Sequence, residues 1–196
     1  MPARPPDSHR TARLLLERWS PAHAESLQPL LEANVERLKP WIPWRVAEPA
    51  ALPALRERLA AFSRAFDDGR EWRYAVRHAT TLALLGEVDL FPRDAQARVA
   101  LADGDRVEIG YWLRADAWGQ GYATEAAAAA LALGLALPGI SRAEIRCDAA
   151  NAPSAAVPRR LGFRLARVIA DEATVPGDGP VQLEVWEWDG SGGRAC

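Results

Sequence analysis

The most constraining stretch of the chain joins a strand, a glycine-containing turn and a strong helix former. Strand-forming residues at 107–113 lead into a polar turn at 114–116, and residues that favour a helix begin near Thr124. The first turn of a helix has unpaired N–H groups and the positive end of the helix dipole. Gly119 and Gly121 lack a Cβ, which lets an anion approach the backbone closely. The stretch predicts an anion site, although two glycines before a helix can also form only a tight turn.

Two common phosphate motifs do not fit this turn. No Gly-Lys-Ser/Thr follows it, so it is not a P-loop, and the third glycine of a dinucleotide-binding fingerprint is missing. The turn by itself therefore leaves both interpretations open.

A second block of residues lies downstream. A strand-like run at 143–148 is followed by Asn-Ala-Pro-Ser at 151–154, a short helix, and Leu-Gly-Phe at 161–163. In this order, the two blocks resemble the GNAT N-acetyltransferase superfamily, in its branch of ribosomal-protein alanine N-acetyltransferase-like proteins. The resemblance spans roughly residues 13–188, which is close to the usual size of one domain.

The resemblance implies a pyrophosphate loop at 118–123. The family's loop is Arg/Gln-x-x-Gly-x-Gly/Ala, and this chain has Trp118 in place of the Arg or Gln. Trp-Gly-x-Gly-Tyr-Ala-Thr-Glu-Ala is a familiar variant in this branch. The residues that the resemblance assigns to acetyl-CoA are Trp112, Leu113, Trp118, Gly119, Gln120, Gly121, Tyr122, Ala123, Thr124 and Asn151.

The composition limits the classes of partner. The 196 residues suit one domain, and a formal net charge of -2 argues against a nucleic-acid partner held by general electrostatics. Cys147 and Cys196 have no metal-ligand spacing and the histidines are scattered, so we expect no metal. Two thiols without a disulfide framework favour a cytoplasmic location. The uncharged run at 126–141 is broken by Pro138 and is too short for a membrane span, so we expect no membrane partner.

Helices and strands are expected to mix along the chain. We expect flexible tails at 1–10 and 190–196 and a single domain at 11–189. The expected helices lie at 20–38, 49–68, 124–137 and 153–160, and the expected strands at 11–17, 71–77, 82–90, 107–113, 143–148, 163–170 and 181–188, with a loop at 176–180. This mixture predicts an α/β or α+β layered fold. The resemblance adds a mixed, mostly antiparallel sheet with helices on both faces, opening as a V between the central strands that end at Leu113 and Cys147.

Acetyl transfer to an amine makes demands on nearby protein groups. The thioester carbonyl needs a hydrogen-bond donor, and by resemblance the peptide groups of Trp112 and Leu113 supply it and pair with the pantetheine amides. The amine must lose a proton, and we choose Glu108 as the catalytic base because burial would raise its pKa. The alternative is an exposed strand carboxylate, and Glu87 and Glu184 are weaker candidates.

The second catalytic candidate is Ser154. By resemblance, a hydroxyl at this position protonates the departing thiolate, and Asn151 contacts the pantetheine arm or fixes the loop. Asn-Ala-Pro-Ser is also a sound helix cap, and capping is compatible with contact to the cofactor.

The substrate-binding candidates are Trp41 and Trp44. They lie in a proline-rich segment at 38–44, and in the resembled branch a Leu-x-x-Trp-x-Pro-Trp segment lies beside the acceptor channel. The alternative is an irregular loop whose tryptophans cover the core.

These observations predict an acetyl-CoA-dependent N-acetyltransferase that transfers the acetyl group directly. No Cys or Ser has a partnering His in a nucleophile setting, which argues against a covalent intermediate. The resemblance points to the N-terminal α-amine of a protein such as a ribosomal protein. A small-molecule amine (an antibiotic, polyamine or amino acid) and a non-catalytic CoA-binding sensor remain as alternatives. The oligomeric state stays open, with a homodimer as one alternative.

Overall fold

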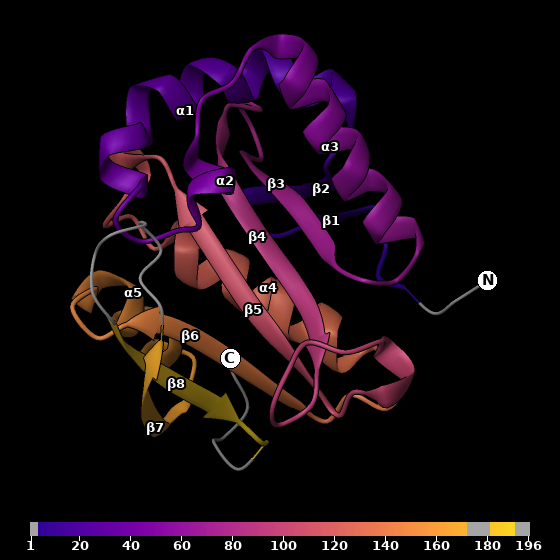
Figure 1. Ribbon diagram of the computed structural model, residues 1–196, viewed down its shortest axis with the longest axis vertical. Coiled ribbons are helices and arrows are strands. Elements are labelled where there is room, and N and C mark those ends of the chain that lie inside the picture. Colours follow the sequence, from indigo (N-terminus) through magenta and orange to yellow (C-terminus); the bar gives the residue numbers. More distant parts are fainter. Residues whose placement is uncertain (1–3, 172–180, 191–196) are drawn as a thin grey trace.

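The computed structural model describes residues 4–171 and 181–190, without the side chains of residues 44, 45 and 171. Eight strands form one sheet in the order β1-β2-β3-β4-β5-β6-β8-β7 (Figure 1). The strands are β1 (Ser8–Arg10), β2 (Leu14–Arg18), β3 (Trp72–His78), β4 (Leu84–Arg93), β5 (Arg106–Leu113), β6 (Arg142–Asp148), β7 (Arg164–Asp171) and β8 (Val181–Trp188). Among them only β5 and β6 pair in parallel, so the sheet is mixed and mostly antiparallel, as predicted.

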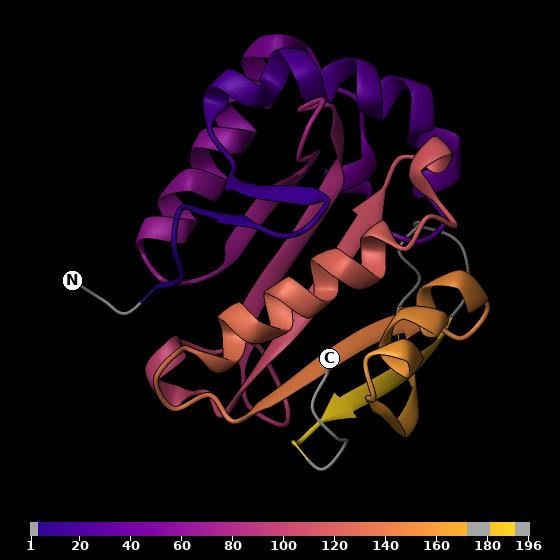
Figure 2. The ribbon, with the colours of Figure 1, turned by 180° about the vertical axis from the view of Figure 1, so that it is seen from behind.

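Helices cover both faces of the sheet. The α-helices are α1 (Ala24–Leu38), α2 (Trp44–Ala47), α3 (Leu52–Asp67), α4 (Tyr122–Leu135) and α5 (Ala152–Arg160), and the short 3-10 helices are η1 (Pro21–His23), η2 (Leu101–Asp103) and η3 (Ala115–Ala117). Helices α1 to α3 lie on one face, here called the front, and α4 and α5 lie on the back (Figures 1 and 2). Within the described part of the chain, no helix is both long and apolar enough to cross a bilayer.

The central strand β5 divides its side chains between two cores. Ile109 and Leu113 belong to the core beneath α4 on the back, whereas Trp112 belongs to the core beneath α1 and α3 on the front. This division follows from the two-residue period of a strand, which sends alternate side chains to opposite faces. Residues 106, 108, 110 and 112 therefore point to the front face.

The sheet opens between β5 and β6. Their parallel pairing runs from Arg106 opposite Arg142 to Ile109 opposite Ile145 and then stops. β5 continues to Leu113 and β6 continues to Asp148, so the two strands separate as a V (Figure 1). The strand–helix–strand unit β5–α4–β6 and the V-shaped opening confirm the predicted fold.

One part of the predicted organisation needs correction. The expected tail at 1–10 is wrong for Ser8–Arg10, which forms β1 and pairs antiparallel with β2; residues 1–3 lie outside the described residues. The proline-rich segment at 38–44 connects α1 to the short helix α2, which begins at Trp44. The single-domain boundaries stay a prediction, and the expected loop at 176–180 and the end of the chain at 191–196 lie outside the described residues.

Candidate active site

A cleft of about 1550 Å³ runs through the V between β5 and β6. Its back part is lined by the start of α4 and by α5, and its front part by charged side chains of β3, β4 and β5. Residues between 38 and 46, from the end of α1 into α2, also border the cleft. One continuous cleft therefore connects the two faces of the sheet at the point where two central strands part.

The predicted anion loop lies in the back part of this cleft. Gly119 and Gly121 have φ values of 73° and 80°, a left-handed conformation that favours glycine. The N–H of Glu125 makes the first hydrogen bond of α4, to the carbonyl of Gly121 at 3.0 Å. The N–H groups of residues 122–124 precede this bond and have no carbonyl one turn earlier, so they are available to an anion.

Two side chains of the loop hold its own backbone. The indole N–H of Trp118 donates to the carbonyl of Leu113 at 2.8 Å, and the amide of Gln120 donates to the carbonyl of Asp116 at 2.8 Å. Although 46% exposed, Trp118 thus ties the loop to the end of β5. Trp118 and Gln120 therefore hold the shape of the loop, and Trp118 also lines the cleft together with the glycines of the loop.

Sequence reasoning missed Arg13, which brings a cation to this loop. Its guanidinium donates to the carbonyl of Gln120 at 2.9 Å and to the carboxylate of Glu125 at 2.6 Å, and it lies 4.7 Å from the ring centre of Tyr122. Glu125 also accepts the N–H of Arg13 and the hydroxyl of Thr11, so it fastens the β1–β2 turn to α4. The sequence contains one indication that a cation comes from elsewhere: Trp118 stands at the position where the family loop has Arg or Gln.

The register of β5 decides which peptide groups face the V. The N–H of Arg114 donates to the carbonyl of Leu85 at 2.7 Å. Antiparallel hydrogen bonding alternates, so Trp112 and Gly110 direct their peptide groups to β4, while Leu113 and Tyr111 direct theirs to the V. Of the two peptide groups predicted to meet acetyl-CoA, that of Leu113 faces the V and that of Trp112 faces β4.

A second group of polar atoms lies where β5, β6 and α5 meet. The oxygen of Asn151 accepts the N–H of Ser154 at 3.2 Å, which confirms the predicted helix cap. The Ser154 hydroxyl lies 3.4 Å from the hydroxyl of Tyr111, which donates to the Ser154 carbonyl at 2.9 Å. Burial raises the pKa of Tyr111, so its hydroxyl stays protonated, and burial raises the pKa of the nearby Cys147 thiol to about 11. Sequence reasoning did not identify Tyr111 as a site residue, because it lies in a hydrophobic run that is typical of any buried strand.

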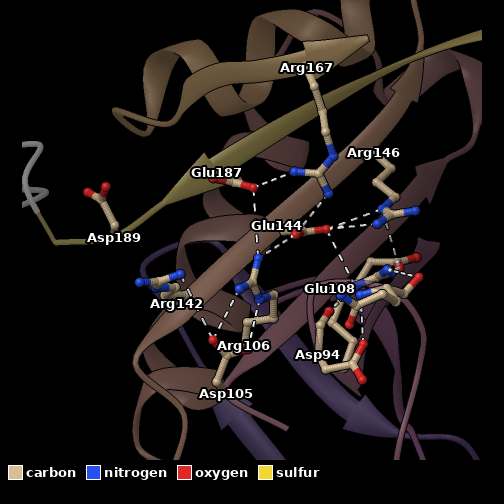
Figure 3. A network of polar contacts seen from close by, with 12 residues as sticks. Asp94, Asp105, Arg106, Glu108, Arg142, Glu144, Arg146, Arg167, Glu187 and Asp189 are labelled. Carbon is tan, nitrogen blue, oxygen red and sulfur yellow. Dashed lines mark hydrogen bonds and ion pairs between the residues drawn. The ribbon is translucent and has the colours of Figure 1, made fainter. Parts of the chain in front are cut away.

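Glu108 lies on the front face, 9% exposed, among arginines from three segments (Figure 3). It forms ion pairs with Arg93, Arg98 and Arg146, the last at 3.9 Å. Burial alone would raise the pKa of Glu108, but the hydrogen bond from Arg98 and the three positive charges outweigh it and lower the pKa. The predicted rise in pKa is therefore wrong, and its catalytic role stays a prediction.

The arginines beside Glu108 continue into a network that joins strands. Glu144, fully buried on β6, accepts hydrogen bonds from Arg106 at 2.9 Å, Arg146 at 3.1 Å and Arg167 at 3.4 Å (Figure 3). Arg167 also pairs with Glu187 of β8 at 2.5 Å. The network fastens β5 to β8 just below the V, where the strands are still paired.

The other sequence candidates are placed as follows. Glu87 is buried and accepts hydrogen bonds from Trp19, Arg73 and Trp112, and Glu184 accepts one from Trp186. Trp41 is 39% exposed and lines the cleft, whereas the side chain of Trp44 lies outside the described part of the structure. Within residues 4–171 and 181–190 no group of three or more His, Cys, Asp or Glu side chains could hold a metal ion.

Comparisons with known proteins agree with this fold. The chain matches the family model described as "Acetyltransferase (GNAT) domain" over residues 13–164. It is similar to a solved structure described as a "Probable acetyltransferase", with a TM-score of 0.80, 23% identity, and coverage of 92% of this chain and 96% of that chain. A search of curated proteins found no match.

Two further solved structures contain the coenzyme. The ribosomal L7/L12 α-N-protein acetyltransferase RimL, in complex with coenzyme A, has a TM-score of 0.77 and 19% identity, with 91% of this chain and 95% of that chain covered. The microcin C7 self-immunity acetyltransferase MccE, in complex with acetyl-CoA and AMP, has a TM-score of 0.77 and 20% identity, with 91% and 93% covered. At these identities the similarity establishes the fold alone.

Proposed function

Because the chain belongs to the GNAT family of acetyltransferases, whose model covers residues 13–164, we propose that it transfers the acetyl group of acetyl-CoA directly to an amine. The observation that carries this proposal is the cleft, which joins an anion-binding loop on the back face to carboxylates on the front. Donor and acceptor can then approach from opposite faces and meet in the V. Direct transfer is supported by Cys147, since a thiol with a pKa of about 11 is a poor nucleophile at neutral pH.

The back part of the cleft fits acetyl-CoA. We propose that the N–H groups of residues 119–124 bind the pyrophosphate and that Arg13 adds a positive charge beside them. The peptide group of Tyr111 and the N–H of Leu113 face the V, where they can bond the pantetheine amides and the thioester carbonyl, while the Leu113 carbonyl already accepts the indole N–H of Trp118. Asn151 lines the same part of the cleft next to Ser154.

The proton donor for the leaving sulfur is proposed to be Ser154. Its hydroxyl lies beside that of Tyr111 and lines the cleft, so the two form a short relay to the sulfur position. Glu108 is the proton acceptor that the sequence suggests, but its arginine partners keep it ionised and make it a weak base.

For the acceptor, we propose the N-terminal α-amine of a protein, such as a ribosomal protein, in the cytoplasm. The similarity to RimL supports this class. The similarity to the microcin C7 self-immunity acetyltransferase supports the second candidate, a small-molecule amine. In either case Trp41, at the border of the cleft, is the proposed contact for the acceptor, together with Trp44 three residues later in the sequence.

An acceptor screen with free-thiol detection tests the proposal. Purified protein and acetyl-CoA would be mixed with peptides that begin with Ala or Ser, with the same peptides already acetylated at the N-terminus, and with polyamines, amino acids and amine antibiotics. We expect thiol release with free peptide N-termini and none with the blocked peptides. Release only with small amines would select the second candidate. Binding of CoA without turnover on any amine would leave a CoA sensor, and no binding would refute both the enzyme and the sensor.

A further inference from the structure

Asp89 of β4 lies at the apex of the V. Its partner across the strand pair is Gly110, the first residue of β5 beyond the last parallel pair with β6. A Cβ at Gly110 would come 2.2 Å from Oδ1 of Asp89, so the carboxyl group fills the space that the absent side chain leaves. Asp89 therefore occupies the front face where a nitrogen must pass to reach a thioester in the V.

Of the three carboxylates along this part of the cleft, Asp89 alone among the described residues has an oxygen without a donor. Glu87 accepts three N–H groups and Glu108 pairs with three arginines. Oδ2 of Asp89 has a long contact with Arg73, at 3.4 Å, whereas Oδ1 has no hydrogen-bond partner in the described structure. Asp89 is only 7% exposed, and a buried, unpaired oxygen is costly unless a ligand supplies a donor.

The charges around Asp89 set its proton affinity. Burial raises the pKa of Asp89 to about 7, opposed by the positive charge of Arg73 on β3 and assisted by the negative charge of Glu87 on β4. The positive charge of Arg98, in the segment after β4, also lowers this pKa, and the negative charge of Glu108 on β5 raises it. A carboxylate in this condition accepts and releases a proton near neutral pH, which a general base requires.

We propose that Asp89, which lines the cleft, is a catalytic residue whose carboxylate binds the attacking amine and takes its proton. This inference rests on the proposed acetyl transfer. The nitrogen lone pair forms the C–N bond to the acetyl carbonyl carbon, and the nitrogen's proton moves to the Asp89 carboxylate. The C–S bond breaks with its electron pair on sulfur, to which the Ser154 hydroxyl delivers a proton before water restores it. Asp89 then returns its proton to water.

The carboxylates of Asp89 and Glu108 have different roles because they lie at different distances from the opening of the V. Gly110 leaves room for the carboxyl group directly over the strand that borders the V. Glu108 lies two residues before Gly110, where β5 and β6 still pair. Its negative charge is neutralised by Arg93 and Arg98. Glu108 thus positions Arg93 and Arg98 at the front of the cleft, and Asp89 contacts the nitrogen.

The test compares wild type with Asp89→Asn, which keeps the side chain's shape and removes its basicity. Asp67→Asn, an exposed carboxylate paired with Arg18 outside the cleft, is the matched control. We expect kcat to fall roughly 100-fold or more in Asp89→Asn, CoA affinity to stay within about twofold, and the control to match wild type. The ratio of wild-type to Asp89→Asn rates should rise with pH through about 7 and then level off, because ionisation of the amine itself cancels in the ratio.

A second readout does not depend on turnover. Because the pKa of Asp89 is raised in the folded protein, the wild type loses stability as pH rises from about 4 to 7, and Asp89→Asn lacks this loss. The melting temperature of the variant relative to wild type should therefore increase between pH 5 and pH 8. If Asp89→Asn does not fold, Asp89→Ser, which is smaller and also without charge, takes its place in both measurements.

The outcomes separate this inference from the proposed function. If wild type acetylates an amine and the variant keeps its rate, or the rate ratio is constant with pH, Asp89 is not the base and only this inference is refuted. If wild type acetylates no amine, the proposed function fails and the inference fails with it. Loss of CoA binding in the variant would assign Asp89 a structural role and would also overturn the inference.

Discussion

Replacing Gly121 with alanine probes the anion loop most sharply. Gly121 has a φ of 80°, and a left-handed conformation costs an alanine roughly 1–2 kcal/mol. The added Cβ would lie 3.3 Å from Nη2 of Arg13, so it also crowds the cation that sits over the loop. The first effect lowers stability alone, whereas the second acts on the ligand site.

Gly139 offers a matched control for the backbone effect. It has a φ of 79°, follows the other end of α4, and a Cβ there would meet only the carbonyl of Gly104, at 3.8 Å. Gly121→Ala and Gly139→Ala should therefore lose similar stability, with a fall in melting temperature of about 2–4 °C per kcal/mol for a chain of this size.

The two variants should differ in CoA affinity, measured by isothermal titration calorimetry. Loss of one charged hydrogen bond costs about 1.5–3 kcal/mol, so Gly121→Ala should bind CoA roughly 10- to 100-fold more weakly than wild type. Gly139→Ala should bind it as wild type does. Equal CoA affinities in the two variants would show that the loop does not approach the phosphates, and the assignment of the anion site would be refuted.

Two further substitutions and one alkylation experiment test other parts of the cleft. Arg13→Gln should weaken CoA binding roughly tenfold at low salt and less at high salt, as calorimetry at two ionic strengths would show; equal loss at both would mean that its charge is not involved. Ser154→Ala should lower kcat roughly 100-fold with little change in CoA affinity, and an unchanged kcat would remove it from the relay. The Cys147 thiol, with its pKa raised to about 11, should be alkylated slowly at pH 8 and faster at higher pH, measured by mass spectrometry; rapid alkylation at pH 7 would contradict its burial.

Much of the fold could be predicted from short-range periodicity. The alternation in β5 and β8 and the alanine-rich run of α4 gave boundaries within about two residues of the structure, because local propensity and burial agree there. β1 was missed because Ser8–Arg10 has no apolar pattern, and its pairing with β2 depends on the turn between them. Helix α3 begins at Leu52, later than expected, with proline in its first turn, where helices accept it.

The site was predictable where its residues are neighbours in sequence. The glycine turn before α4 and the cap formed by Asn151 and Ser154 follow from local motifs, and the assignment of this turn to acetyl-CoA stays a prediction. Arg13 and Asp89 could not be found in this way, because their importance comes from strand register and from partners far away in the chain. For Glu108 the expected pKa shift had the wrong sign, since the arginines that surround it come from other segments.

We propose above all that the start of α4 binds the diphosphate of the coenzyme and directs its thioester into the V. A crystal structure of the CoA complex measures this directly. It should place diphosphate oxygens about 3 Å from the N–H groups of residues 122–124 and the sulfur between Tyr111 and Cys147, with Asp89 on the opposite side. A nucleotide bound elsewhere, with those N–H groups occupied by protein atoms, would contradict the claim.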